Sequence, residues 1–218
     1  MDNEVKTRRY TGDRRLAEAA RRRRRIIEAA LELFAERGYT GTSVRDVARR
    51  AGVAVDTVYA SVGRKPQLLL AAHDLVLGEG AVDEAGAPVG ALRRHYVAEV
   101  REAPDAHTKI ATYAEWMGRL LPATAPLLEA LRDAGAADEE CRATWEAVQE
   151  RRAANMRLFA ADLRSTGELR EELDDDLVAD LIWSMNSAAY YSALARRGWS
   201  GQRFAGLLRD VWTRTLLA

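Results

Sequence analysis

The residues whose types and spacing are most informative lie in one stretch, residues 43–62, SVRDVARRAGVAVDTVYASV. This stretch predicts two short helices joined by a tight turn at Gly52-Val53-Ala54. Ala48 supplies the small side chain needed where two helices cross closely, and Gly52 can adopt the left-handed backbone that the turn requires. The outer face of the second helix is then left open, and a DNA major groove about 12 Å wide admits such a helix.

Catalytic chemistry is not indicated anywhere in the chain. The three histidines have no partner at a metal-ligand spacing: His73, His95 and His107. Cys141 stands among charged residues without a nearby histidine, which favours a spectator thiol. The run Asp174–Asp176 is typical of a helix start, where the macrodipole favours acids. Since no Gly-rich phosphate loop, nucleophile elbow or HExxH motif occurs, we expect a protein that is not an enzyme, without cofactor or metal.

Length and composition bound the class of protein. The 218 residues suffice for one large or two small domains, and a hydrophobic content of 48% is ordinary for a globular protein. No apolar run approaches the roughly 18–20 residues that span a bilayer, and the N-terminus lacks the apolar segment of a secretory signal. A single cysteine excludes internal disulfides. We therefore expect a cytoplasmic protein without membrane contact.

Charge is distributed unevenly, although the net charge is zero. Residues 1–70 hold 16 Lys and Arg against 9 Asp and Glu, a net charge of +7, and the remainder holds 17 against 24, a net charge of −7. This asymmetry indicates a polyanionic partner at one end of the chain. The run Arg21–Arg25 fits two interpretations: a solvated helix face, or a face that steers the protein toward phosphates.

The elements that must position residues 43–62 are all predicted to be helices. Residues 1–13 lack hydrophobic periodicity and are expected to form a mobile arm. From about Arg14 a helical pattern runs to Gly38, with Ile26, Ile27, Ala30, Leu31, Leu33 and Phe34 on one face. Ser43 is expected to cap the next helix, with Asp46 as the reciprocal cap. Val58 points inward from the helix of residues 55–61, and Pro66 marks a further helix start.

Glycines and Pro88 predict a joint near residues 78–88. Beyond it we expect helices near 89–102, 105–120, 123–134, 138–166, 174–196 and 200–217, separated by Pro104, Pro122, Gly135, Gly167 and Gly198. No strand with convincing alternation is present. The predicted fold is all-α, with a small N-terminal helical domain and a larger helical bundle.

Residues 22–77 resemble the DNA-binding domain of the TetR (tetracycline-repressor-like) family of transcriptional regulators. The resemblance is carried by Ala29, Ala30, Leu33, Phe34, Gly38-Tyr39, Thr42-Ser43-Val44, Ala48, Ala51-Gly52-Val53, Thr57-Val58-Tyr59, Lys65 and Leu68. It covers about a quarter of the chain, and beyond it only length and all-α character agree with the family. After the arm expected at 1–13, the resemblance implies a helix-turn-helix domain of three-helix type at 14–80 and a ligand-binding and dimerisation domain at 81–218.

The resemblance also implies contacts to double-stranded DNA. Thr42 and Ser43 would offer hydroxyl and backbone N–H groups to phosphate, as would the Tyr59 hydroxyl and the Lys65 ammonium, and Arg45 would contact phosphate or a base. Base edges would be read from Val55, Asp56, Thr57, Ala60 and Ser61.

The sequence departs from the family pattern within this stretch. Ala54 stands where Ser or Thr is frequent, Asp56 where a small residue is common, and Ser61-Val62 where an aromatic pair is usual. An acid can accept a hydrogen bond from cytosine N4, so we expect Asp56 to contribute sequence choice.

The last two helical segments are apolar on several sides, which predicts burial on several sides. We expect a homodimer interface formed by Leu177, Leu181, Met185, Ala188, Leu207, Leu208, Val211 and Trp212. A monomeric bundle with these helices at its centre is the alternative. A twofold dimer would place two recognition helices on one face of a palindromic site.

Aromatic and polar residues also recur in the middle helices. Such stripes form a core more often than a ligand site. The family resemblance implies an effector cavity, for which the candidates are His95, Tyr96, Tyr113, Trp116, Met117, Trp145, Trp183, Asn186, Ser187 and Tyr190. The expected function is a homodimeric repressor that a small-molecule effector releases from its operator. The alternatives are activation, a helical scaffold protein without DNA binding, or a cofactor-free enzyme.

Overall fold

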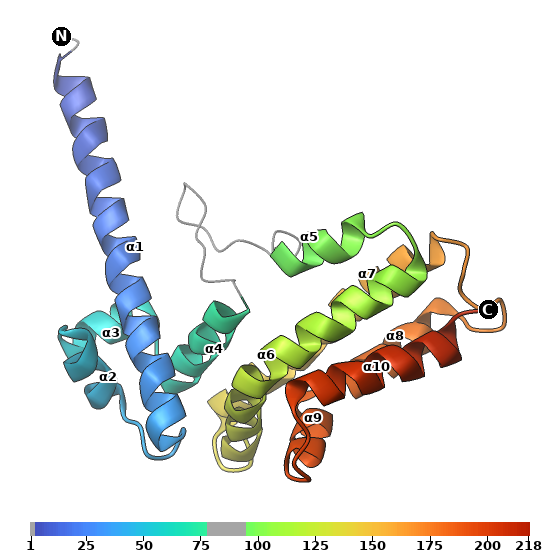
Figure 1. The fold of residues 1–218 in the computed structure, drawn as a ribbon. Helices are drawn as coiled ribbons and strands as arrows, with labels where there is room; N and C mark the ends of the chain where they lie inside the picture. Colours follow the sequence, from blue (N-terminus) through green and yellow to red (C-terminus); the bar gives the residue numbers. More distant parts are fainter. Residues whose placement is uncertain (1–2, 78–94) are drawn as a thin grey trace. The chain divides into compact units, whose positions relative to one another are not determined.

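A computed structural model describes residues 3–77 and 95–218, with side chains for residues 14–77 and 96–218. Within these ranges the chain forms ten α-helices, and the only β pairing is an isolated bridge between Leu169 and Leu217 (Figure 1). The prediction of an all-α fold is confirmed. No helix in the described part of the chain is long and apolar enough to cross a membrane.

The chain divides into two compact units, residues 1–89 and 90–218. The boundary that we expected between residues 80 and 81 falls in residues 78–94, outside the described residues, as do the expected joint at 78–88 and the start of the expected helix at 89–102.

The N-terminal unit contains α1 (Asn3–Arg37), α2 (Val44–Ala51), α3 (Val55–Ser61) and α4 (Lys65–Val76). Helix α1 packs against the other three helices. Their common core consists of fully or nearly fully buried side chains: Ile26, Ala30, Leu33, Phe34, Val47, Ala48, Val58, Leu68 and Leu69. The face expected from Ile26 to Phe34 is buried as predicted, except that Leu31 is half-buried.

Helix α1 begins much earlier than we expected. The structure assigns residues 3–13 to α1, whereas the sequence favoured an arm up to residue 13 and a helix from about Arg14. The helix start was predicted from hydrophobic periodicity alone. Periodicity cannot reveal the part of a helix that extends beyond the buried core, because that part has no buried face. At the other end, α1 stops at Arg37, immediately before Gly38 as predicted, and Gly38 has a left-handed φ of +70°.

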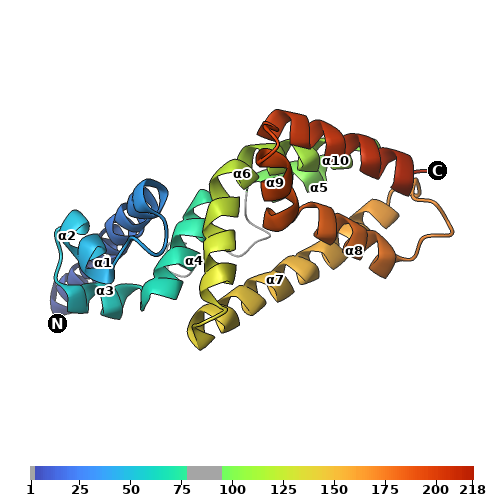
Figure 2. The same ribbon diagram turned by 90° about the horizontal axis from the view of Figure 1, so that it is seen from below.

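The C-terminal unit contains α5 (His95–Glu102), α6 (Ala106–Ala134), α7 (Glu139–Arg164), α8 (Asp175–Met185), α9 (Ala188–Ala195) and α10 (Gly201–Leu216). Helix α6 is central and contacts α5, α7, α9 and α10, while α7 also lies along α8 (Figure 2).

The expected break at Pro122 was wrong, because Pro122 and Pro126 both lie inside α6. Pro122 has no N–H to donate to the carbonyl one turn earlier, that of Gly118. This carbonyl lies where α6 and α10 approach so closely that a Cβ built on Gly201 would be 2.0 Å from the Gly118 oxygen. Helix α6 thus continues through Pro122 in the region where it packs closely against α10.

The expected helix at 174–196 is divided into α8 and α9. Asn186 ends α8 and is buried, and its side-chain amide donates to the Tyr113 hydroxyl at 2.6 Å. The Ser187 hydroxyl then accepts from the Tyr190 N–H and caps α9. These two side-chain bonds stabilise a break that the uniformly apolar pattern concealed.

Candidate DNA-binding surface

Helix α2 has the capping box that the sequence predicted. The Ser43 hydroxyl accepts from the Asp46 N–H at 3.1 Å, and the Asp46 carboxylate accepts from the Ser43 N–H at 3.1 Å. Hydrogen bonds from Ser43, together with the Arg49 guanidinium, lower the pKa of Asp46 below its usual value. Gly52 follows with a φ of +67°, so the turn also has its expected backbone.

Helix α3 is anchored by one side chain and exposes the others. Val58 is fully buried. Asp56, Tyr59 and Ala60 are exposed, while the remaining expected base-reading positions, Val55, Thr57 and Ser61, are half-buried. Ala54, at the N-cap, makes no side-chain hydrogen bond to the helix, as its residue type implied. The outer face of α3 thus combines an acid, a phenol and small side chains.

The Thr42 hydroxyl is used inside the unit, contrary to the expected phosphate contact. Thr42 is buried, and its hydroxyl donates to the carbonyls of Leu33 at 3.1 Å and Gly38 at 2.9 Å. It therefore satisfies carbonyl groups near the C-terminus of α1. Ser43 is exposed, but its hydroxyl and N–H both bond Asp46, so a phosphate would have to compete with that carboxylate.

Lys65, expected to contact phosphate, begins α4. Its ammonium lies 4.1 Å from the centroid of the Tyr39 ring, which in turn stacks on Phe34. A cation–π contact of this kind restrains the lysine while leaving its charge intact. Lys65 is half-buried, and the following Pro66 is buried at a position where its missing N–H is tolerated.

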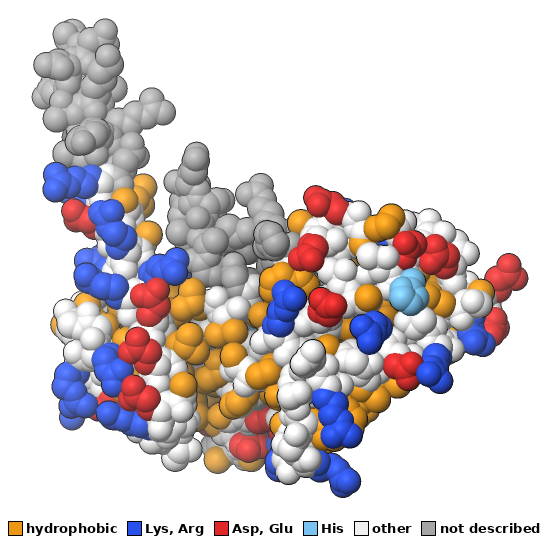
Figure 3. All heavy atoms as spheres, in the orientation of Figure 1, with side chains coloured by type: hydrophobic (Ala, Val, Ile, Leu, Met, Phe, Trp, Pro, Cys, Tyr) orange, Lys and Arg blue, Asp and Glu red, His pale blue; other side chains and the backbone are white. Residues whose placement is uncertain are grey.

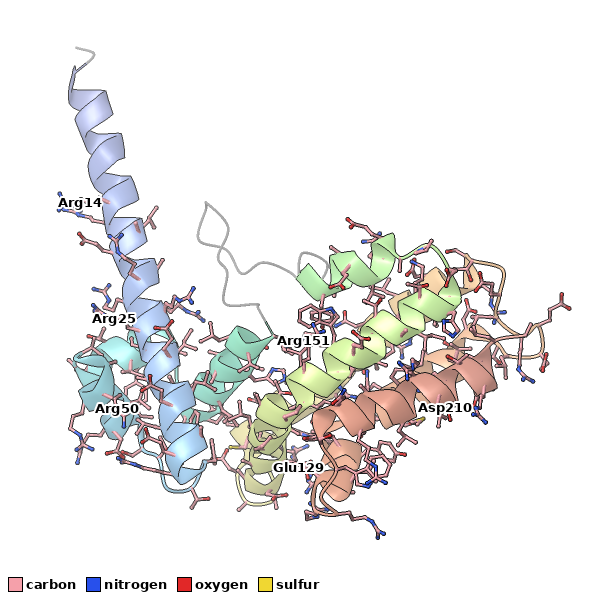
Figure 4. All side chains as sticks on the ribbon, viewed as in Figure 1. Arg14, Arg25, Arg50, Glu129, Arg151 and Asp210 are labelled. Atoms are coloured by element: carbon pink, nitrogen blue, oxygen red, sulfur yellow. The ribbon has the colours of Figure 1, made fainter. Side chains whose placement is uncertain are left out.

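The arginines of this unit differ in whether their charge is neutralised. Arg50 pairs with Glu32 at 2.8 Å and Glu36 at 3.0 Å, and Arg49 pairs with Asp46 at 2.5 Å. Arg45, an expected DNA contact, is exposed and makes no ion pair in the described part of the chain. Figure 4 shows Arg50 beside the C-terminal half of α1. The pairing of Arg50 was not predictable from the sequence, since its partners lie 14 and 18 residues away.

Some of the expected effector residues meet in a polar cluster inside the C-terminal unit. The cluster joins Tyr113 on α6, Met156 on α7 and Asn186, whose amide nitrogen is 3.3 Å from the Met156 sulfur. Arg152 donates to the Asn186 side-chain oxygen at 2.5 Å and to the Trp183 carbonyl at 2.9 Å. Burial lowers the pKa of the Arg152 guanidinium. Sequence reasoning missed Arg152, because an arginine on a long charged helix looks like a surface residue.

The other expected effector residues make different contacts. Trp116 donates to Glu99 at 2.8 Å, and its ring lies 5.8 Å from that of Tyr96. Tyr190 packs on Phe204, Ser187 caps α9, Met117 is buried and Trp145 is half-buried. The His95 side chain lies outside the described side chains.

A groove of about 610 Å³ lies between α6 and α10, and none of the expected effector residues lines it. Its walls are Ala111, Glu115, Gly118, Arg119, Gln202, Ala205, Gly206 and Arg209.

The expected dimer residues fall into two groups. Leu177 is 50% exposed, and Leu181, Met185, Leu207 and Val211 are half-buried, so these five are accessible to a partner. Ala188, Leu208 and Trp212 are instead buried within the subunit, where Trp212 stacks on Tyr113 at 5.9 Å. The apolar pattern could not separate the two groups, since both have the same residue types.

Among the described residues no group of three or more His, Cys, Asp and Glu side chains is arranged to hold a metal ion.

The N-terminal unit matches a known family of proteins. Residues 26–72 match the family model described as bacterial regulatory proteins, tetR family. The HTH-type transcriptional repressor Rv3405c from Mycobacterium tuberculosis is 47% identical over 49 residues, which are 22% of this chain and 26% of that protein. An HTH-type regulator from Mycobacterium bovis, Mb3439c, matches to the same extent. The match thus spans about a quarter of the length of these curated relatives.

Solved structures share the fold over most of the chain at low sequence identity. A Saccharomonospora viridis protein in complex with choline superposes with a TM-score of 0.66 at 20% identity, covering 90% of this chain and 97% of that one. FadR from Bacillus subtilis in complex with stearoyl-CoA superposes with a TM-score of 0.65 at 19% identity, covering 86% and 95%. A TetR transcriptional regulator from Chloroflexus aurantiacus gives 0.64 at 20% identity, covering 93% and 100%.

The family is one of regulatory proteins and not of enzymes, which agrees with the missing nucleophile–base arrangement in the sequence. The capped α2, the Gly52 turn and the exposed α3 all lie in the part of the chain that matches the tetR family of bacterial regulatory proteins.

Proposed function

We propose that this protein is a DNA-binding transcriptional regulator, acting in the cytoplasm as a repressor that reads its operator with α3. The observation that supports this most is the exposure of α3: Val58 fixes the helix from below, while Asp56, Tyr59 and Ala60 are left to solvent. Tyr59, the largest side chain of α3, is 48% exposed and so is available to a partner. The capping box of α2 and the Gly52 turn restrict how α3 is presented.

We further propose a homodimer built on α8 and α10. Leu177, Leu181 and Met185 on α8, with Leu207 and Val211 on α10, are apolar side chains that the subunit leaves partly uncovered. A twofold dimer carries two copies of α3, which suits a palindromic operator with half-sites one helical turn apart.

The effector is proposed to bind in the C-terminal unit. Proteins of the same fold bind choline, triclosan and stearoyl-CoA, ligands of different charge and size, so the fold does not select one class. The cluster of Tyr113, Asn186 and Arg152 offers hydroxyl, amide and guanidinium groups among apolar side chains. A ligand would release the operator if it bound better to a conformation with a different separation of the two α3 helices.

The direct test is fluorescence anisotropy with the DNA that precedes the protein's own gene, measured between about 50 and 200 mM KCl. A regulator that contacts phosphates should lose affinity steeply over this range, with a slope of roughly −0.9 per phosphate contact. Replacing Tyr59 by Ala should weaken binding without unfolding the unit. No binding, or binding indifferent to salt, would favour a helical scaffold protein instead.

A further inference from the structure

The exposed positive charge of the N-terminal unit is concentrated on α1 and not on the helix-turn-helix. Between residues 14 and 25, α1 has seven arginines and one acid, Glu18. Of the seven arginines only Arg23 is not exposed. Figure 3 shows Lys and Arg side chains gathered along the described part of α1, and Figure 4 shows Arg14 and Arg25 directed outward from it.

Most of these arginines are not neutralised by an acid. Arg14 lies 3.6 Å from Glu18, and Arg24 lies 2.8 Å from Glu28. Within the described residues Arg15, Arg21, Arg22 and Arg25 make no ion pair. Four exposed and unpaired guanidinium groups on three turns of one helix form a strong local field, which attracts a polyanion.

The helix-turn-helix itself has little net charge to offer. Arg49 and Arg50 are paired with acids, and α3 has no Lys or Arg but carries Asp56. The remaining charges of the helix-turn-helix, those of Arg45 and Asp56, are opposite in sign and cancel in its net charge. Phosphate neutralisation supplies most of the sequence-independent affinity of DNA-binding proteins, so this contribution has to come from another element.

Helix α1 is joined to the recognition helix at a defined point. The Arg23 side chain donates to the Ser61 carbonyl, at the C-terminal end of α3, with a distance of 3.2 Å. Arg14, Arg21 and Arg25 follow one side of the helix at spacings of seven and four residues, and Arg15 and Arg22 lie on the adjacent side. At 1.5 Å per residue, Arg14 to Arg25 spans about 16 Å, which matches about five nucleotides of one DNA strand.

We propose that these arginines of α1, namely Arg14, Arg15, Arg21, Arg22 and Arg25, form a second DNA-contacting surface. This surface binds phosphates beside the base pairs that α3 reads, and it supplies affinity without sequence preference. The inference rests on the proposed function, because it needs a protein that binds duplex DNA. It assigns the two components of binding to different helices: α1 gives most of the affinity, and α3 gives the choice between sequences.

The test uses the full-length protein, a 40-base-pair duplex of random sequence, and anisotropy between about 50 and 200 mM KCl. The variant is Arg21→Gln with Arg22→Gln. The matched control is Arg196→Gln with Arg197→Gln, an adjacent and exposed pair in the C-terminal unit that changes the net charge equally. Losing two phosphate contacts should reduce the slope of log K against log salt by about 2 for one subunit, or about 4 for a dimer.

The expected result is a reduced slope and at least about tenfold weaker binding near 100 mM KCl for the α1 variant, with the control unchanged. Circular dichroism should show unchanged helix content. If the variant lost helix, the pair Arg14→Gln with Arg15→Gln, further from the core, would replace it.

Equal slopes for wild type, variant and control would overturn the inference and leave the proposed function intact. Failure of the wild type to bind any duplex would overturn the proposed function itself. Binding of anionic lipid vesicles through the same arginines, without duplex binding, would assign them to a membrane instead.

Discussion

A side-chain cap can be introduced at the N-terminus of α3, and its effect on stability can be calculated. Ala54 occupies the N-cap with φ −70° and ψ 152°, a backbone conformation in which a Ser side chain can accept from the first turn of a helix. Position 54 is exposed, so a hydroxyl has room there. Replacing Ala by Ser at an N-cap typically contributes about 1 kcal/mol. For a unit of this size, Ala54→Ser should raise the midpoint of thermal unfolding by roughly 4–8 °C.

The assay can separate the two units, because all five tryptophans lie beyond residue 115. Far-ultraviolet circular dichroism reports helices of both units, whereas tryptophan fluorescence reports the C-terminal unit. If the units unfold separately, Ala54→Ser should shift only the dichroism transition. Ala60→Ser is the control: position 60 is equally exposed but lies inside α3, where Ser is neutral or costs up to about 0.5 kcal/mol. An Ala54→Ser protein no more stable than the Ala60→Ser protein would refute the assigned N-cap.

Three further predictions concern the Gly52 turn, the end of α1 and the capping box of α2. Gly52→Ala should destabilise the protein by about 1–2 kcal/mol, because φ is +67° at this position, although no atom crowds a Cβ there. Gly206→Ala, inside α10, should instead stabilise the protein by about 0.5–1 kcal/mol. The two changes in unfolding free energy, measured by urea unfolding, are required to have opposite signs. Thr42→Val should cost about 1–3 kcal/mol by removing the buried hydroxyl that donates to the carbonyls at the end of α1, and Thr42→Ser should cost clearly less. Equal losses would show that the hydroxyl is not the reason. Asp46 has a lowered pKa, so its stabilisation is complete above the unfolded pKa of about 3.9 and is lost as the pH falls through the folded value. The stability difference between wild type and Asp46→Ala should therefore hold from pH 7 to 5 and shrink below about pH 4, and a difference that grew in acid would contradict the capping box.

Local chemistry was predictable from the sequence wherever one short segment determines it. The Ser43–Asp46 box, the left-handed Gly52 and the buried Val58 each depend on neighbours within a few residues, and the structure has all three. The bounds of α3 also agree with the prediction, because its start and its end are both set by adjacent turns.

Features that depend on distant partners were not predictable. The Thr42 hydroxyl has two possible uses, and only the position of the α1 end decides between them. Pro122 lies inside α6 where α10 packs at Gly118, and Asn186 ends α8 where its amide donates to the Tyr113 hydroxyl, so both features involve residues distant in the sequence. The division of the apolar residues of α8, α9 and α10 into core and accessible surface likewise depends on how α6 packs against them.

The central claim is that α3 reads sequence, and selection from a randomised duplex library tests it most directly. Wild-type protein should enrich a palindromic site. Asp56→Asn removes the negative charge of an exposed side chain on α3 at nearly constant size, and should change the preferred base at one position in each half-site. The same enriched sequence for both proteins, or no enrichment by the wild type, would contradict the claim.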